Sequence, residues 1–202
     1  MRGFVVVINA QHDFMLPEGA LPVAGAAALI EPLRAWLADL RAEDTAGVLF
    51  TFDTQDVRNR AASRGSGAVL PHCVKGSPGW QLVVDLGEIH HTIPIYRMEK
   101  SVSDMWGDSC GPVEALSDFG CTLSRFGQAW SRERFFAELH DAGVRDVTIV
   151  GVSVGHCLRL AVAGLTARGF RVAVRTELTR GVVREINAAH RDERTKAAVR
   201  LG

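Results

Sequence analysis

Short apolar runs that alternate with amphipathic segments limit this chain to a small set of folds. The runs Phe4–Ile8, Gly47–Phe52 and Val147–Val150 are rich in β-branched residues and have the length of buried strands. Arg171–Val174 adds an alternating run, and Thr92–Tyr96 is a fifth strand candidate. Because strands and helices alternate, we predict an α/β protein of three α/β/α layers with a mostly parallel sheet.

Helical spacing of apolar residues is found in Ala26–Arg41, Arg132–Ala142 and Cys157–Arg168. The segment Gly107–Trp130 breaks this rhythm, because it is rich in Gly, Ser and Asp and is long for a plain connection. We expect it to form a functional loop or partial cap. A length of 202 residues suits one domain, spanning 1–202, with this insertion at about 107–130.

The charge balance and the cysteines restrict the partners and the compartment. Net charge is zero, so nothing favours nucleic acid. No uncharged apolar stretch reaches the roughly 18 residues of a membrane helix, and the N-terminus does not resemble a signal peptide. We therefore expect a cytoplasmic protein without membrane contact, in which Cys73, Cys110, Cys121 and Cys157 are thiols.

Cys157 is the strongest candidate for a nucleophile. The strand Val147–Val150 is followed by the tight turn 151–156, and a helix is predicted to begin near Cys157. Free N–H groups at a helix N-terminus favour a thiolate and can also hold an oxyanion. The alternative interpretation is a buried core cysteine, which is common in α/β proteins.

Lys100 is the candidate partner of this thiol. The chain has only three lysines, Lys75, Lys100 and Lys196, and uses arginine elsewhere, although arginine cannot readily release a proton. Active sites of open parallel sheets form at the carboxyl ends of the strands, so Lys100 should lie near Asn9, Asp53 and the turn before Cys157. The alternative is a solvated surface lysine.

A metal site is the third candidate feature. Asp53 should end a strand, and His72 lies in the segment LPHCVKGSPG. One carboxylate and one imidazole are too few for a strong site, and Gln55 could add only a weak carbonyl ligand. A hydrogen-bonded pair is the alternative interpretation of Asp53 and His72.

Four segments together resemble a known family. VVVINAQHDF resembles the opening motif V-D-x-Q-x-D-F, LPHCVKGSPG is similar to W-P-x-H-C-V-x-G-T-x-G, and EKSVSDMW resembles K-x-x-x-S-A-F. GVSVGHCLRLAVAGLTARGFRV resembles G-V-A-T-D-x-C-V-x-x-T-A-x-D-A-x-x-x-G-F-x-V. In order and spacing these segments resemble the isochorismatase-like cysteine hydrolases, and the histidine segment resembles the nicotinamidase branch.

This resemblance implies a mechanism and a set of site residues. Cys157 would attack the carbonyl of a small carboxamide, release ammonia and form a thioester that water hydrolyses, with nicotinamide as the default substrate. Lys100 would assist, and the amides of Ser153 and Cys157 would form the oxyanion hole. Members often have a cis peptide at the position of Val152–Ser153. The substrate pocket would be lined by Phe14, Trp106, His156 and the position of Val69.

Three positions depart from the family pattern. Asn9 stands where the general-base aspartate is expected, and an amide cannot accept the thiol proton at neutral pH. Gln55 replaces a metal-binding histidine, so a divalent metal (zinc, iron or manganese) would bind only at a weakened site of Asp53, His72 and Gln55. We expect that no cofactor is required. Val69 replaces a tryptophan that stacks on the pyridine ring.

Two alternatives to the amidohydrolase stay open. The departures favour a catalytically silent relative that binds a small ligand or a protein partner. An isochorismatase-type hydrolase of another substrate is the second alternative, although those enzymes generally lack the cysteine. In every case the resemblance implies a homodimer or homotetramer.

Overall fold

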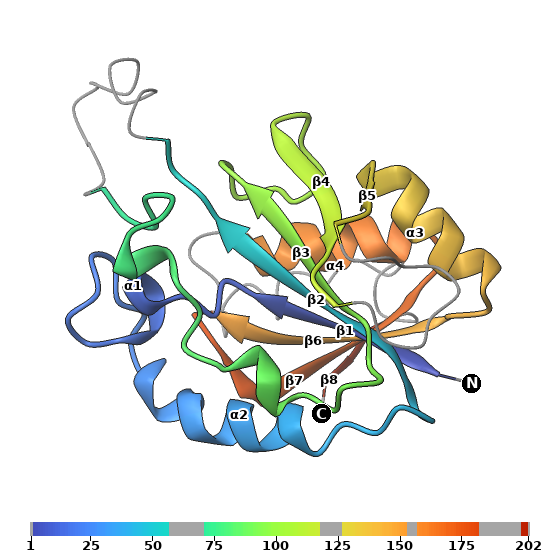
Figure 1. Cartoon of the computed structure of the whole chain (residues 1–202), viewed down its shortest axis with the longest axis horizontal. Coiled ribbons are helices and arrows are strands. Elements are labelled where there is room, and N and C mark those ends of the chain that lie inside the picture. Colours follow the sequence, from blue (N-terminus) through green and yellow to red (C-terminus); the bar gives the residue numbers. More distant parts are fainter. Residues whose placement is uncertain (1, 57–70, 118–126, 153–156, 182–198, 202) are drawn as a thin grey trace.

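A computed structural model describes residues 2–56, 71–117, 127–152, 157–181 and 199–201 of the chain. Its centre is an eight-stranded sheet with the order β5-β4-β3-β2-β1-β6-β7-β8 (Figure 1). The strands are β1 Gly3–Ile8, β2 Thr45–Asp53, β3 Ile95–Lys100, β4 Cys110–Ala115, β5 Ala129–Trp130, β6 Asp146–Val152, β7 Arg171–Arg180 and β8 Val199–Leu201. The helices are α1 His12–Met15, α2 Ile30–Ala38, α3 Arg132–Asp141 and α4 Cys157–Ala167, with 3₁₀ turns η1 Ala27–Leu29, η3 Pro78–Trp80 and η4 Leu86–Glu88.

The six strands β3, β2, β1, β6, β7 and β8, which are neighbours in this order, are all parallel. At one edge β4 pairs antiparallel with β3, and β5 pairs antiparallel with β4. The central strand β1 is buried along nearly its whole length, which explains its continuous apolar sequence. The prediction of a three-layer α/β protein with a mostly parallel sheet is therefore confirmed.

Alternate residues of β1 enter two separate apolar layers. Val6 and Ile8 pack with the apolar residues of α3 and α4 on one face of the sheet. Val5 and Val7 pack with α1 and α2 on the other face. Figure 1 shows these helices on opposite sides of the sheet. Successive side chains of a strand therefore point alternately to the α3 and α4 face and to the α1 and α2 face of the sheet.

Two features differ from the sequence prediction. The fifth strand was expected at Thr92–Tyr96 but begins at Ile95 and extends to Lys100. In segment 107–130 the described residues include β4 and β5, which extend the sheet. Residues 118–126 lie outside the described part, so a cap at 107–130 and the single domain 1–202 stay predictions.

The topology places a site between β1 and β6. From β1 the chain continues to β2 and β3 on one side, whereas β6 and β7 lie on the other side of β1. Such a reversal in strand order opens a crevice at the carboxyl ends of the strands, where open α/β sheets bind ligands. Asn9 follows β1 and Cys157 begins α4 after β6, so both residues lie at this edge of the sheet.

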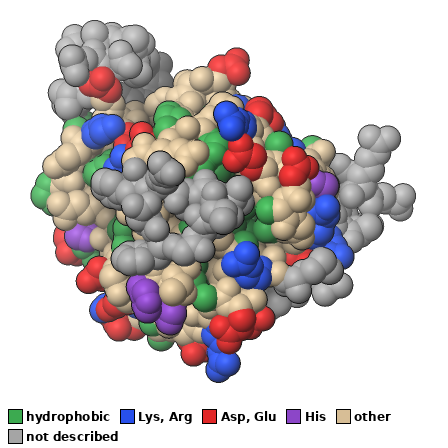
Figure 2. All heavy atoms as spheres, turned by 45° about the vertical axis from the view of Figure 1, so that its right-hand side comes forward, with side chains coloured by type: hydrophobic (Ala, Val, Ile, Leu, Met, Phe, Trp, Pro, Cys, Tyr) green, Lys and Arg blue, Asp and Glu red, His purple; other side chains and the backbone are tan. Residues whose placement is uncertain are grey.

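The surface agrees with the neutral net charge. On the face in Figure 2 the basic and acidic side chains are interspersed. Among the described residues, no helix is both long and apolar enough to cross a membrane. The cytoplasmic location stays a prediction.

Candidate active site

Cys157 and Lys100 meet in the interior. Cys157 is the first residue of α4 and Lys100 the last residue of β3, and they are 4% and 2% exposed. Lys100 Nζ donates a hydrogen bond to Cys157 Sγ at 3.9 Å. The alternative of a solvated surface lysine is wrong, because the ammonium lies in the core. The thiol of Cys157 therefore lies beside a buried cation at the N-terminus of a helix, the surroundings that are typical of reactive cysteines.

Asn9 lies on the same face of the sheet. It is fully buried and has a positive φ of 48°, which asparagine tolerates better than most residues. Thr51 alternates on β2 with the buried Phe50 and Phe52, and its Oγ1 donates a hydrogen bond to Asn9 Oδ1 at 3.4 Å. Among the described residues, Asn9 Nδ2 has no hydrogen-bond acceptor. The position of the expected base therefore holds a neutral, incompletely bonded amide.

Asp53, Gln55 and His72 form a hydrogen-bonded group at the end of β2. Gln55 Nε2 donates to Asp53 Oδ1 at 2.9 Å, and His72 Nε2 lies 3.7 Å from Asp53 Oδ2. Burial raises the pKa of Asp53, but the His72 hydrogen bond, the charge of Lys100 and the Gln55 hydrogen bond outweigh it, so the net shift is downward. The carboxylate is thus held ionised by donors.

The buried Gln11 and the partly buried Asp13, to which the sequence analysis assigned no role, organise this edge. Gln11 accepts a hydrogen bond from the Asp53 amide at 2.8 Å and donates to the Asp53 carbonyl at 2.9 Å. Asp13 accepts from the backbone amides of Cys73 at 2.6 Å and Ala20 at 3.0 Å. Cys73 has a φ of 46°, so Asp13 holds the turn after His72 in a rare conformation. The sequence indicated both residues only through the polar side chains that directly follow the apolar strand β1.

The predicted pocket residues have different positions. Phe14 is buried, with its ring 5.5 Å from that of His72, and so reaches the site. Trp106 packs against α4, where Nε1 donates to the Leu160 carbonyl at 3.1 Å and the Arg168 guanidinium lies 3.7 Å from the ring centroid. These contacts occupy the indole, and a pocket-lining role for Trp106 stays a prediction.

Four predicted features fall outside the described residues: Ser153, His156, Val69 and the peptide between Val152 and Ser153. The oxyanion hole at Ser153 therefore stays a prediction. Among the described residues, the candidate donors to an oxyanion are the backbone amides of the first turn of α4, which begins at Cys157.

The other described cysteines differ from Cys157. Burial, with Asp53 and Asp13 as smaller causes, raises the pKa of the Cys73 thiol far above its usual range. Burial also raises the pKa of Cys110, whose Sγ donates to the Asp104 carbonyl at 3.2 Å. Both thiols are therefore held protonated, whereas Cys157 has a cation beside it.

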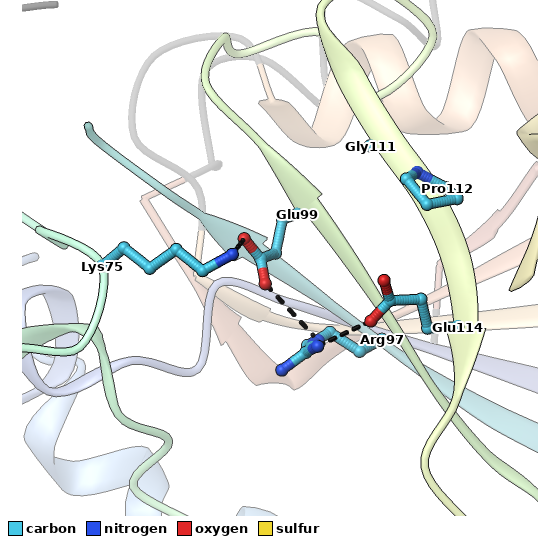
Figure 3. Close-up of a pocket in the computed structure, with 6 residues that line it drawn as sticks. All are labelled: Lys75, Arg97, Glu99, Gly111, Pro112 and Glu114. Atoms are coloured by element: carbon cyan, nitrogen blue, oxygen red, sulfur yellow. Dashed lines mark hydrogen bonds and ion pairs between the residues drawn. The ribbon is translucent and has the colours of Figure 1, made fainter. Parts of the chain in front are cut away.

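A hollow lies on β4 and on the face of β3 opposite to Lys100 (Figure 3). It has a volume of about 270 Å³, and its charged lining residues are Lys75, Arg97, Glu99 and Glu114. Lys75 pairs with Glu99 at 2.6 Å and Arg97 with Glu114 at 2.6 Å, so each cation faces a carboxylate. The hollow contains no group of the Cys157 site.

The chain is similar to known proteins over nearly its whole length. No family model matches the chain. The chain is 26% identical over 201 residues to a nicotinamidase/pyrazinamidase of Mycobacterium tuberculosis, covering 98% of this chain and 96% of that protein. A pyrazinamidase of Pyrococcus horikoshii in complex with zinc aligns with a TM-score of 0.65 at 19% identity over 100% of this chain and 99% of the other. An isochorismatase-like hydrolase of Alkaliphilus metalliredigens aligns with a TM-score of 0.62 at 14% identity over 100% and 94%.

The fold is therefore similar to that of solved pyrazinamidases and of an isochorismatase-like hydrolase, and the resemblance predicted from the sequence is confirmed. The sequence similarity is to the nicotinamidase branch, because a relative that matches nearly the whole chain is a nicotinamidase/pyrazinamidase.

The residues at Asp53 do not fit the zinc that the Pyrococcus structure contains. The described residues contain no group of three His, Cys, Asp or Glu side chains close enough to hold a metal. Segment 57–70, between Gln55 and His72, contains none of these four residue types. Gln55 points its amide nitrogen at Asp53, and a nitrogen that donates a proton is not a metal ligand. We derive no step through a metal.

Proposed function

We propose that the chain is an amidohydrolase that cleaves the C–N bond of a small carboxamide through a thioester on Cys157. The observation that carries this proposal is the buried hydrogen bond of 3.9 Å from Lys100 Nζ to Cys157 Sγ at the start of α4. The similarity to a nicotinamidase/pyrazinamidase supports nicotinamide as the default substrate, with nicotinate and ammonia as products.

In the proposed reaction Cys157 Sγ attacks the amide carbonyl and forms the C–S bond. The oxyanion is held by amides at the start of α4 and, as proposed, by the Ser153 amide. The C–N bond breaks as the nitrogen takes up the proton that the thiol has given up, and ammonia leaves. Water then attacks the thioester, releases the acid and returns the proton to sulfur.

Asn9 limits this reaction. An amide side chain cannot accept the thiol proton and pass it to the leaving nitrogen. Because a positioned general base contributes about 10²–10⁴-fold, we expect turnover to be lower than with aspartate by a similar factor.

A second candidate function is favoured by the same residue. Asn9 Nδ2 is buried, and among the described residues it has no acceptor, so a bound ligand oxygen would satisfy it. This favours a silent relative that binds a small molecule. An isochorismatase-type activity is disfavoured by Cys157, and assembly as a homodimer or homotetramer stays a prediction.

The test is ammonia release from a panel of carboxamides that includes nicotinamide. The unchanged chain is compared with Asn9→Asp, and Cys157→Ala is the control. We expect Asn9→Asp to raise the rate at least about 10²-fold and Cys157→Ala to abolish it. If neither the unchanged chain nor Asn9→Asp releases ammonia from any amide, the amidohydrolase proposal fails and ligand binding is favoured.

A further inference from the structure

The carboxylate of Asp53 and the ammonium of Lys100 belong to adjacent positions of the sheet. Strands β2 and β3 are parallel neighbours, and Asp53 is the register partner of Lys100. Register partners point to the same face of a sheet, and neighbouring strands lie about 4.8 Å apart. Lys100 is 2% exposed and the Asp53 side chain 13%, so the two charges are both removed from bulk water.

Lys100 requires a negative charge nearby. An unpaired ammonium in the interior carries a large desolvation cost, which only an opposite charge or several acceptors can offset. Residue 9, where the resemblance leads us to expect an aspartate, is the neutral Asn9 and supplies no charge. Glu99 is next to Lys100 in β3, but it contacts Lys75 and Arg97 on the opposite face.

The surroundings of Asp53 hold its carboxylate in place for such a pairing. Gln11 binds both the backbone amide and the backbone carbonyl of Asp53. Gln55 donates to one carboxylate oxygen and His72 lies beside the other. These neighbours restrict the side chain, and the charge of Lys100 is among the causes that lower the Asp53 pKa.

We propose that Asp53 is the counter-ion of Lys100 in place of residue 9, and that Gln55 and His72 hold its carboxylate for this role in a metal-free group. Asp53 thereby acts as a positioning residue, because it acts on Cys157 only through Lys100. The inference builds on the proposed reaction centre of Lys100 and Cys157, but it concerns charge pairing and is tested without turnover.

The test is a double-mutant cycle on thermal unfolding with Asp53→Asn, Lys100→Met and the double variant. Breaking a buried ion pair by removing one partner is strongly destabilising, so we expect Asp53→Asn to lower Tm by about 10 °C. In the Lys100→Met background the same change should lose most of its effect, because no cation is left unpaired. An equal loss of Tm in both backgrounds would overturn the pairing.

Rescue separates charge pairing from a merely structural role of Asp53. Adding Asn9→Asp to Asp53→Asn returns a carboxylate to the other side of Lys100, and we expect it to recover at least half of the lost Tm. If Asn9→Asp recovers nothing, Asp53 is not the counter-ion. The matched control is Glu99→Gln, a carboxylate-to-amide change on the opposite face of β3, which should be additive with Lys100→Met.

The metal-free part is tested by elemental analysis of the purified protein and by adding zinc during thermal unfolding. We expect substoichiometric metal and no zinc-dependent rise in Tm, whereas Gln55→His should gain a zinc-dependent rise by adding a third ligand. Stoichiometric zinc, iron or manganese whose removal lowers Tm would contradict the proposal. Because no arm measures ammonia, these outcomes are independent of whether the chain hydrolyses a carboxamide.

Discussion

Replacing Lys100 with methionine should make Cys157 far less reactive towards iodoacetamide. The ammonium lies 3.9 Å from Sγ, and at this distance Coulomb's law with an effective dielectric constant of about 20 gives an attraction of about 4 kcal/mol to a thiolate. Desolvation of the buried pair offsets part of this attraction. A remaining stabilisation of about 2–3 kcal/mol corresponds to a loss of roughly 10²-fold in alkylation rate at neutral pH.

The assay is the rate of Cys157 alkylation, followed by mass spectrometry of the peptide that contains it. Lys75→Met is the matched control, because Lys75 is exposed and pairs with Glu99 at 2.6 Å on the opposite face. We expect this control to react like the unchanged chain. A Lys100→Met variant that is alkylated at the unchanged rate would refute the electrostatic reasoning.

Three further predictions concern other parts of the structure. Gly164→Ala would place a Cβ against the Trp106 indole, so we expect the free energy of unfolding to fall by about 1–3 kcal/mol. An unchanged midpoint of urea unfolding would contradict this. Gly151 has a φ of 109°, and a Cβ there would collide with the Ile8 backbone. We therefore expect Gly151→Ala to lower the free energy of unfolding by at least about 3 kcal/mol. An unchanged stability in calorimetry would disprove this. Because its pKa is raised, Cys73 should stay a thiol and resist alkylation in the folded protein as the pH rises past about 8.5, and rapid labelling at pH 9 would contradict the burial argument.

The central strands could be predicted from the sequence because burial on both faces produces apolar runs. The edge could not. Strand β4 contains Gly111 and Pro112, which are unfavourable in a central strand. Here they lie beside a register irregularity of the pairing with β3 and outside the residues that pair with β5. Strand β3 was placed too early because Arg97 and Glu99 interrupt its apolar pattern, although ion pairs on the half-exposed face satisfy both charges.

For the site, the rule on carboxyl ends correctly brought Lys100 to Cys157. The position of Trp106 could not be predicted, because it depends on the space at Gly164 and on the Arg168 guanidinium, which are distant in sequence. The role of Gln11 was also missed, because its hydrogen bonds to Asp53 exist only after β1 and β2 have paired.

The central claim is that Cys157 forms a thioester with the acyl group of the substrate. An aryl ester of a pyridine carboxylic acid tests it directly, because its leaving group departs without taking up a proton, so that Asn9 need not pass a proton to it. The measurement is the intact mass of the protein after mixing, followed by peptide mapping. We predict one acyl group on Cys157, reduced in Lys100→Met and absent in Cys157→Ala. An unmodified Cys157, or acylation of another residue at the same rate, would contradict the account.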